Sequence, residues 1–461
     1  MNAENKKLYA GFSRVEITPQ VGYPVYYKGI STQILDPLFV KSMVLVQGQT
    51  KFAFLFCDLF GTSIDIVNAV REKLSNNQLD FPTENIIFTS THTQSGPIYT
   101  HTGKSYFKQG RYPLGRVSGE ETILMEEAYS KELIPQMAQC LLEANANLTA
   151  VRFQAGTCQC PGLTFNRRYH MKDGSVQFNP GFQNHDIVAP AGPVDNQLNY
   201  LMMRKSENDE PLAMLSNFAL QAFTYGKAQF TPDYPHFFEK SLQDKFGPDF
   251  LSLWTIAPSG EINQFDVSKS GPQIDYYNVT KKIGDTLAYA VLANLENIKD
   301  VTNPCLKINR DVFQAQLQDY TPEQLINARN VVRKQDQWSL ELIEAQKILD
   351  LEKFHVQGHT FPQEIYIVQI DQDTAMVTLP ALPFAAFGLD IRKRSPFAMI
   401  FPLELTNSYE AMYIPTEKAH KEGSYEIINS RFKPGEGEKL VDKLINMLAN
   451  FKTSLQTNIK V

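Results

Sequence analysis

The chain is predicted to adopt an α/β fold with mixed β-sheets and flanking helices. Apolar runs typical of strands alternate with segments of helical spacing along all 461 residues, as they do in mixed α/β proteins. Hydrophobic residues make up 43% of the chain and charged residues 20%, which suits a globular protein with a large core and two or three lobes.

The first third of the chain carries clear local signals. The apolar run KFAFLFCDLF (51–60) predicts a buried strand, and Ser63 is expected to cap a helix that follows it. The apolar residues of this helix share one face: Ile66, Val67, Val70 and Leu74. A second strand is expected over 85–90, and then a helix over 120–144 in which Pro135 introduces a kink.

Strands dominate the middle of the chain and helices return near its end. Strand-like runs lie at 150–158, 199–204, 212–220 and 250–257. Helices are expected near 277–295, 322–354 and 438–455, around the β-rich stretch EIYIVQIDQDTAMVTLP. Because the sequence contains no internal repeat and no low-complexity linker, we expect one domain over 1–461, with at most a weak boundary near 300–320.

Charge and hydropathy exclude several classes of partner. The net charge is −6 and no run is rich in Lys or Arg, which argues against nucleic-acid and anionic-membrane binding and favours a small-molecule ligand. No apolar run reaches the roughly 18 residues of a membrane span. The start of the chain lacks the apolar core of a signal peptide, so we expect either a cytoplasmic protein or an extracytoplasmic one that has been trimmed. The oligomeric state stays open.

Cysteine usage gives a weak signal. The five cysteines form no CxxC pair and no even set: Cys57, Cys140, Cys158, Cys160 and Cys305. Buried free thiols are the simpler interpretation, and disulfides are the alternative.

The segment NIIFTSTHTQSGP (85–97) is the first candidate for a functional site. An apolar run leads here into a polar turn that carries His92, Gln94 and Ser95, which is where α/β proteins often place their chemistry. Ser95 lacks the GxSxG turn of serine hydrolases, so we do not expect it to act as a nucleophile with His92.

Several motifs follow one another in a specific order. They are GFSRVEITPQVGYP, STHTQSGP, NRRYHMKDGSVQFNPG, DIVAPAGPVDNQL, SNFALQ, APSGEINQFD, LPALPFAAFGLDIRKRSP and NSYEAMYIPTEKAHKEGSYE. Together they resemble the catalytic, N-terminal domain of the neutral/alkaline ceramidase family, especially its bacterial ceramidase-like branch. The resemblance covers about residues 8–455, and it leaves no room for the immunoglobulin-like C-terminal domain of true ceramidases.

The resemblance implies a zinc site, and this chain has only some of the ligands of that site. Family members hold zinc with two histidines, a glutamate and a tyrosine, and the metal activates a water that attacks an amide carbonyl. His92 matches the first histidine, and Gln94 stands where a second histidine flanks the site. The other histidine ligand falls on Gln221, whose neutral amide is a poor zinc ligand.

The remaining two ligand positions complete this comparison. The glutamate falls on Leu382, and the tyrosine is matched by Tyr409, with Tyr413 a less suitable equivalent. One histidine and one tyrosine are too few for a tetrahedral site with an open position. We therefore expect no zinc and no other cofactor at this site.

Three further residues correspond to positions that contact the substrate in the family. Asn263 stands where the catalytic serine would be, and its amide can bind a carbonyl or a sugar hydroxyl. Arg167 resembles the family arginine that holds the substrate, and Arg168 lies beside it. The alternative for the two arginines is a solvated face or a set of salt bridges.

Other candidates also have two interpretations. His92 is either a site residue or an ordinary hydrogen-bonded histidine, and Asp58 either orients His92 or caps the next turn. Glu261 matches a family aspartate that braces a turn. The pair His355 and His359 has the i, i+4 spacing of zinc ligands, but the segment lacks an HExxH glutamate, so we do not expect a metal there.

Two functions follow from these observations. The first is a non-catalytic or weakly active protein that binds a polar small molecule, such as a carbohydrate or an amide, in an inherited cleft. The second is a hydrolase of an amide or ester with a rebuilt active centre that uses groups such as His92, Tyr409 and Arg167.

Overall fold

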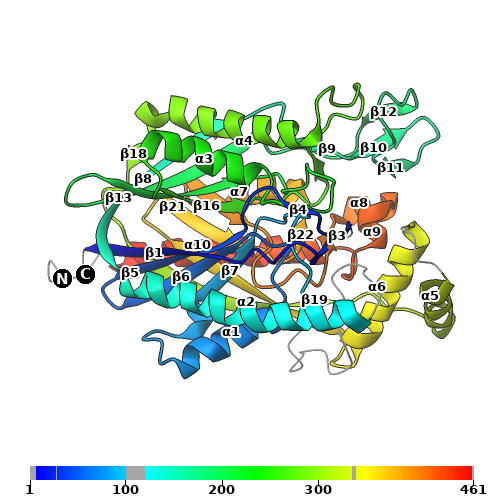
Figure 1. The fold of residues 1–461 in the computed structure, drawn as a ribbon, viewed down its shortest axis with the longest axis horizontal. Coiled ribbons are helices and arrows are strands. Elements are labelled where there is room, and N and C mark those ends of the chain that lie inside the picture. The colour runs from blue at the N-terminus through cyan, green and yellow to red at the C-terminus, as the bar shows by residue number, and fades with distance from the viewer. Residues whose placement is uncertain (1–6, 27, 100–119, 335–338, 459–461) are drawn as a thin grey trace.

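The structure is a computed structural model that describes residues 7–26, 28–99, 120–334 and 339–458. Two β-sheets pack face to face, and helices cover their outer faces (Figure 1). This arrangement confirms the predicted α/β class with mixed sheets and flanking helices.

The larger sheet has nine strands and mixes parallel with antiparallel pairs. Eight of them lie in the order β16 (Leu251–Ile256), β14 (Pro211–Phe218), β13 (Gln197–Lys205), β8 (Thr149–Gln159), β1 (Leu8–Glu16), β5 (Phe39–Gln47), β6 (Thr50–Cys57) and β7 (Ile86–Ser90), and β18 (Lys299–Asp300) pairs with β8. The pairs β6–β7 and β14–β16 are parallel, as expected of strands joined by a crossover helix.

The smaller sheet has four strands. They lie in the order β19 (Lys307–Gln316), β20 (Thr360–Gln369), β21 (Thr374–Thr378) and β23 (Met399–Leu403). Alternate residues of both sheets point into one shared apolar layer, in which Phe54 and Leu215 of the larger sheet join Val368 and Phe401 of the smaller one. The chain passes from one sheet to the other between β18 and β19.

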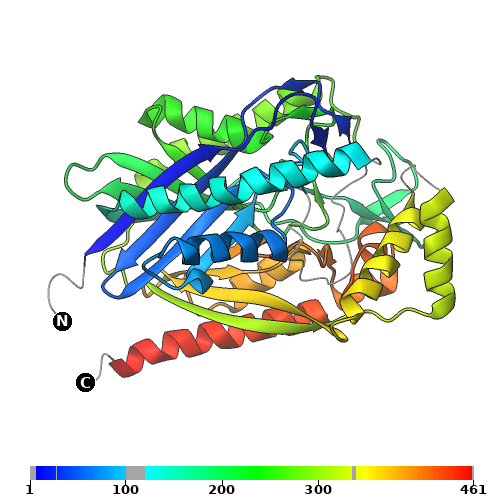
Figure 2. The same cartoon turned by 60° about the horizontal axis from the view of Figure 1, so that its bottom comes forward.

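Ten helices surround the sheets in the described part of the chain. They are α1 (Ile64–Asn76), α2 (Glu120–Ala146), α3 (Tyr234–Phe246), α4 (Tyr276–Ala293), α5 (Pro322–Lys334), α6 (Leu340–His355), α7 (Ala385–Arg394), α8 (Glu417–Glu422), α9 (Tyr425–Ile428) and α10 (Glu436–Asn458). Helix α2 packs on β1 and β5, whereas α3 and α4 pack on β16 and β8. Figure 2 shows α10 on the opposite side of the molecule, along the smaller sheet.

Short strands form five small sheets near the ends of the main strands. They are β2 (Pro24–Val25) with β3 (Gly29–Ile30), β4 (Gln33–Ile34) with β15 (Gln229–Phe230), β9 (Phe165–Asn166) with β17 (Ile262–Asn263), β22 (Leu382–Pro383) with β24 (Tyr413–Ile414), and β10 (Arg168–Met171) between β11 (Val176–Phe178) and β12 (Ile187–Pro190).

Local expectations hold in part. Ser63 caps α1, since its side chain accepts a hydrogen bond from the N–H of Ile66. The single helix expected over 322–354 is wrong: α5 and α6 are separate helices that form a hairpin, and Ser339 caps the second by accepting from the N–H of Leu342. No helix among the described residues is long and apolar enough to cross a membrane. The five cysteines are free.

Candidate functional site

The carboxyl ends of five strands meet at one end of the two sheets. Backbone hydrogen bonds link them in a circuit, which we call the strand-end ring: Ala222 N to Thr91 O (3.2 Å), Ala257 N to Phe218 O (3.0 Å), Glu404 N to Ile256 O (2.8 Å), Leu379 N to Leu403 O (2.7 Å) and Asn407 N to Phe88 O (3.0 Å). The ring joins β7, β14, β16, β23 and β21. Open α/β sheets usually bind ligands at such strand ends.

His92 lies on the turn that leaves β7 and is 1% exposed. Its Nδ1 is 2.7 Å from the carbonyl oxygen of Phe60, and because a carbonyl only accepts, Nδ1 carries the proton and Nε2 keeps its lone pair. Its backbone has a positive φ of 57°. Burial, helped by the charge of Arg167, lowers the pKa of His92 to about 3, so the imidazole is neutral at physiological pH.

Tyr409 lies close to His92 through a shared neighbour. The ring of Phe60 packs 4.1 Å from the imidazole of His92 and 5.9 Å from the ring of Tyr409, measured between centroids. Gly61 allows this approach, since a Cβ at that position would lie 2.8 Å from Cγ of Tyr409. His92 and Tyr409 are therefore held against one aromatic side chain.

The amide side chains lie on the neighbouring turns. Gln221 is 1% exposed, and its Nε2 donates to the carbonyl oxygen of Ser259 at 3.2 Å. Gln264 donates to the backbone carbonyl of Gln221 at 2.7 Å, so these amides tie the end of β14 to that of β16. The half-buried Gln94 is joined to the same turn, because its N–H donates to the carbonyl of Ala222 at 3.4 Å.

Asn263 and Leu382 lie in the small sheets beside the ring. The side chain of Asn263 donates to Oδ1 of Asn179 at 3.0 Å and is 9% exposed. Leu382 is 1% exposed and pairs with Tyr413 in the parallel β22–β24 ladder. Gly260 packs directly on this strand, since a Cβ there would lie 2.5 Å from the carbonyl oxygen of Leu382.

Arg167 is a buried member of an ion-pair network. It is 5% exposed, and its Nε donates to Glu426 at 2.7 Å while Nη2 donates to the carbonyl of Gly260 at 2.8 Å and to the hydroxyl of Tyr413 at 3.0 Å. The guanidinium also lies over the rings of Phe178 and Tyr413. These bonds use Nε and Nη2 and make Arg167 a salt-bridge donor, one of the two roles that the sequence left open.

Arg168 points toward α8 and α9 and is 2% exposed. Its Nη1 donates to the carbonyl of Gly423 at 2.8 Å and to Glu426 at 3.3 Å, and its Nη2 donates to Glu422 at 3.2 Å. Glu426 thus accepts from both arginines. The pair of arginines is buried, so the alternative of a solvated face is wrong.

Three buried carboxyl groups lie at the ring. Glu404 and Glu410 were not identified from the sequence, and Glu261 was expected only to brace a turn. Glu261 accepts from the N–H of Ala385 with both oxygens, at 3.2 and 2.9 Å, and burial raises its pKa to about 8. Glu404 accepts from the N–H and the hydroxyl of Ser259, and burial raises its pKa far above its usual range. Burial also raises the pKa of Glu410 to about 7. The position of Glu404 just after an apolar strand could have identified it in the sequence as a carboxyl group at a strand end.

Within the described part of the chain, these contacts divide the predicted site residues into separate groups. One group holds His92 with Tyr409, a second holds Gln94 with Gln221, and a third holds Arg167 with Tyr413. An inherited binding cleft would require the side chains of six residues to converge on one small ligand, and this stays a prediction: His92, Gln94, Gln221, Asn263, Arg167 and Tyr409.

The zinc expected of the family does not fit the residues present. Gln221 uses its amide to bond Ser259, and Leu382 offers only carbon atoms at its side chain. Within the described ranges, no group of three or more His, Cys, Asp or Glu ligand atoms forms around His92. The side chains therefore supply His92 and Tyr409 without the second imidazole and the carboxylate that zinc prefers.

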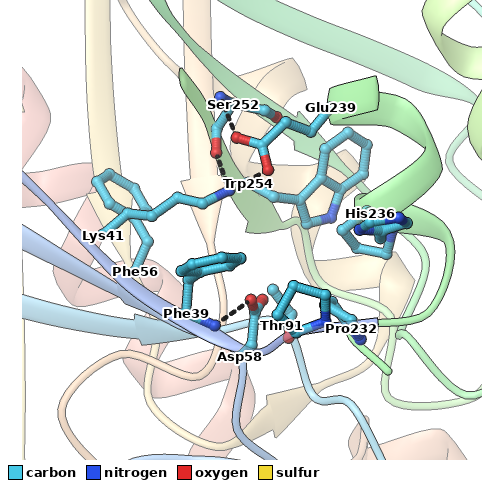
Figure 3. A pocket seen from close by; sticks show the side chains of 12 residues that line it. Phe39, Lys41, Phe56, Asp58, Thr91, Pro232, His236, Glu239, Ser252 and Trp254 are labelled. Carbon is cyan, nitrogen blue, oxygen red and sulfur yellow. Dashed lines mark hydrogen bonds and ion pairs between the residues drawn. The ribbon is translucent and has the colours of Figure 1, made fainter. Parts of the chain in front are cut away.

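A small cavity lies beside the carboxyl ends of β6 and β7. It leaves about 20 Å³ between β5, β16 and α3, enough for one or two water molecules. Figure 3 shows Asp58, Thr91, His236 and Trp254 around it. Oδ2 of Asp58 accepts from the N–H of Phe39 at 2.9 Å, so Asp58 braces the start of β5, a role that neither expected alternative included.

Ser95 has a partner other than His92. Its hydroxyl oxygen accepts from Nζ of Lys28 at 3.0 Å, and its hydroxyl donates to the carbonyl of Tyr225 at 3.4 Å. Burial lowers the pKa of Lys28 to about 8. The serine therefore belongs to a buried contact between loops, in agreement with the missing GxSxG turn.

Comparison with known proteins gives a likeness in fold. No family model matches the sequence, and no curated protein matches it. The crystal structure of neutral ceramidase from Pseudomonas aeruginosa is similar to this chain with a TM-score of 0.69 and 14% identity, over 97% of this chain and 75% of that one. A ceramidase complexed with C2 gives a TM-score of 0.71 and 14% identity, over 97% and 76%. The fold expected from the ceramidase resemblance is confirmed.

Proposed function

We propose that this protein uses the neutral-ceramidase fold to bind an uncharged polar small molecule and does not hydrolyse amides with zinc. The observation that carries the proposal is the neutral, hydrogen-bonding character of the strand-end ring. The candidate ligand is a carbohydrate or an amide-containing compound, because hydroxyl and amide groups both donate and accept hydrogen bonds.

Most of the charge at the ring is cancelled. His92 is neutral because its pKa is about 3, and Glu261 keeps its proton at neutral pH because its pKa is about 8. Arg167 and Arg168 are neutralised by Glu426 and Glu422. A ligand with a net charge would lose its hydration here, where the two arginines already have partners, whereas an uncharged polar ligand avoids that cost.

The same facts weigh against the alternative of a hydrolase with a rebuilt centre. A general base works best with a pKa near the working pH, and an imidazole with a pKa of about 3 is a weak base there. Arg167 is already committed to Glu426, Gly260 and Tyr413. Tyr409, the third group proposed for that centre, carries a phenol, which is a poor nucleophile while it keeps its proton at neutral pH.

Calorimetric titration with a matched pair of sugars tests the proposal. N-acetylglucosamine combines hydroxyl groups with a neutral amide, and glucosamine has the same ring with an ammonium group. We expect the first to bind and the second to bind at least about tenfold more weakly, because the ammonium would lose its hydration without gaining a counter-ion. Short-chain ceramide is included as a neutral amide of the family type. Failure of all neutral sugars and amides to bind would refute the proposal.

Single-site variants locate the binding. Asn263→Ala and Gln94→Ala each remove one amide, which should weaken binding by about twofold to tenfold, the usual effect of one neutral hydrogen bond. Gln273→Ala removes an amide from an exposed loop position and serves as the matched control. Equal binding by all four proteins would place the ligand elsewhere.

A ceramidase assay tests the second half of the proposal. We expect no release of fatty acid from ceramide, since help from one general acid or base is worth only about 10²–10⁴-fold, far below what amide hydrolysis needs. Release of fatty acid that is lost both with EDTA and in His92→Ala would establish the zinc enzyme instead.

A further inference from the structure

A cluster of metal-binding side chains lies outside the strand-end ring, at the base of the α5–α6 hairpin. Figure 1 shows helices α5 and α6 of this hairpin at the right of the molecule. Asp319 follows β19, His355 is the last residue of α6, and His359 directly precedes β20. One ligand atom from each residue lies within 4.8 Å of the others. The i, i+4 histidine pair thus gains a carboxylate from a segment more than thirty residues earlier, which its flanking sequence did not show.

The surrounding contacts bring these three side chains together. The imidazole of His355 stacks on the ring of Tyr320 at 5.3 Å between centroids, and the imidazole of His359 lies 4.8 Å from that of His355. Gly358 has a φ of +125°, which lets the chain turn back sharply between the two histidines. The carbonyl of His359 then accepts from the N–H of Leu317 at 2.9 Å, beside Asp319.

The carboxylate of Asp319 keeps one oxygen for a further partner. Its Oδ2 binds Nζ of Lys433 at 2.8 Å, while its Oδ1 faces Nδ1 of His359 at 3.8 Å. A distance of 3.8 Å is too long for a direct hydrogen bond. Lys433 therefore holds the carboxylate in position without occupying the oxygen that faces the histidines.

An unsatisfied nitrogen points independently to a ligand. Nε2 of His355 is buried and has no hydrogen-bond partner among the described residues. A buried polar atom without a partner destabilises the folded protein, and such atoms in native proteins are usually matched by a water or an ion. Beside a second imidazole and a carboxylate, a cation would satisfy this nitrogen.

We propose that Asp319, His355 and His359 bind one divalent transition-metal ion, with Zn²⁺ as the best match. Two imidazoles and one carboxylate form a common zinc ligand set, and water completes the tetrahedron. Zinc–ligand distances of about 2.0–2.2 Å require the ligand atoms to lie about 3.3 Å apart. Asp319 and His359 are exposed side chains, so small rotations bring them from the present spacing to that value.

The ion would join three segments that are distant in the sequence. It would tie the end of β19, the end of α6 and the start of β20 together, and so hold the α5–α6 hairpin against the smaller sheet. Its expected role is structural, because the site adds a link between elements that are distant in the sequence.

Titration of the metal-stripped full chain with Zn²⁺ alone tests this site. We expect one Zn²⁺ per chain and a rise in the melting temperature on binding, because the metal binds only the folded arrangement. His359→Ala and Asp319→Asn should each weaken binding by at least about tenfold, since even loss of an outer-shell partner of a metal commonly has that effect. His185→Ala removes an exposed histidine elsewhere and should bind as the parent protein does.

Two results would overturn the proposal. One is the absence of saturable binding at one Zn²⁺ per chain. The other is binding that survives in both His359→Ala and Asp319→Asn, which would place the ion at a different site. If that binding is then lost in His92→Ala, the ion belongs to the strand-end ring. Substitution with Co²⁺ gives a second readout, because a visible absorption band that disappears in His359→Ala reports direct coordination.

Discussion

Replacement of Glu426 by glutamine is expected to destabilise the protein strongly. Glu426 is fully buried and accepts from Nε of Arg167 at 2.7 Å and from Nη1 of Arg168 at 3.3 Å. Glutamine has nearly the same shape but carries no charge, so two buried guanidinium groups would lose their common counter-ion. Loss of one partner of a buried ion pair costs about 3–5 kcal/mol. Because one amide oxygen remains as an acceptor, we expect a loss near the lower value.

Urea unfolding followed by circular dichroism measures this change. The matched control is Glu352→Gln, which removes the same charge from an exposed pair with Arg329, where the side chains are 32% and 51% exposed. An exposed pair contributes at most about 1 kcal/mol, so the control should remain close to the parent protein. Adding Arg167→Met to Glu426→Gln should recover part of the loss, because it removes an unpaired buried charge.

A result in which Glu426→Gln is no less stable than Glu352→Gln would refute this reasoning. Arg167 would then hold its charge without Glu426. The role of Arg167 as a residue that binds the ligand, which the structure argues against, would become the better interpretation.

Two further changes test the ring and the helix packing. Glu261 keeps its proton up to about pH 8 in the folded protein, whereas the same carboxyl ionises near its usual pKa of 4.5 in the unfolded chain. Its contribution to stability is therefore complete below about pH 4.5 and is lost as the pH rises toward 8. Glu261→Gln should therefore reduce the fall in unfolding free energy between pH 5 and pH 8, and an unchanged fall would contradict the assignment. Gly284→Ala should destabilise the α3–α4 contact despite a helix-propensity gain of about 1 kcal/mol, because the new Cβ would lie 2.5 Å from the carbonyl oxygen of Tyr234. Thermal unfolding measures this change in stability, and a variant that melts at a higher temperature than the parent protein would contradict the prediction.

Elements with strong local patterns could be predicted from the sequence. The strand expected over 51–60 is β6, and Ser63 caps the next helix as its side chain predicts. The hairpin of α5 and α6 was missed because apolar residues of both helices face each other, so the apolar periodicity continued from one helix to the next. Ser339 was the available signal, since serine is a strong N-cap residue.

The site could be predicted only where one segment carries the information. His92 and Gln94 follow a strand. A polar turn after an apolar run indicates the end of a strand even when only one sequence is known. The partners of Arg167 and Asp319 could not be predicted in this way, because Glu426 lies 259 residues from Arg167 and both histidines of the metal cluster lie beyond α5. Burial, which sets the protonation of Glu261 and Glu404, likewise depends on the folded arrangement.

Restoring the two missing ligands tests whether the strand-end ring is a former zinc site. If the positions correspond as the resemblance implies, Gln221→His with Leu382→Glu would place two new ligands beside His92 and Tyr409. Without metal this double variant should be much less stable than the parent protein, because a carboxylate at the 1% exposed position of Leu382 would be buried without a counter-ion. Zinc should then recover stability, since binding free energy adds to folding free energy. The titration is made with His359→Ala in both proteins, so that any zinc taken up is not held by the hairpin cluster. Recovery with zinc in the double variant but not in its parent would support the correspondence, whereas a double variant that folds equally poorly with and without zinc would refute it.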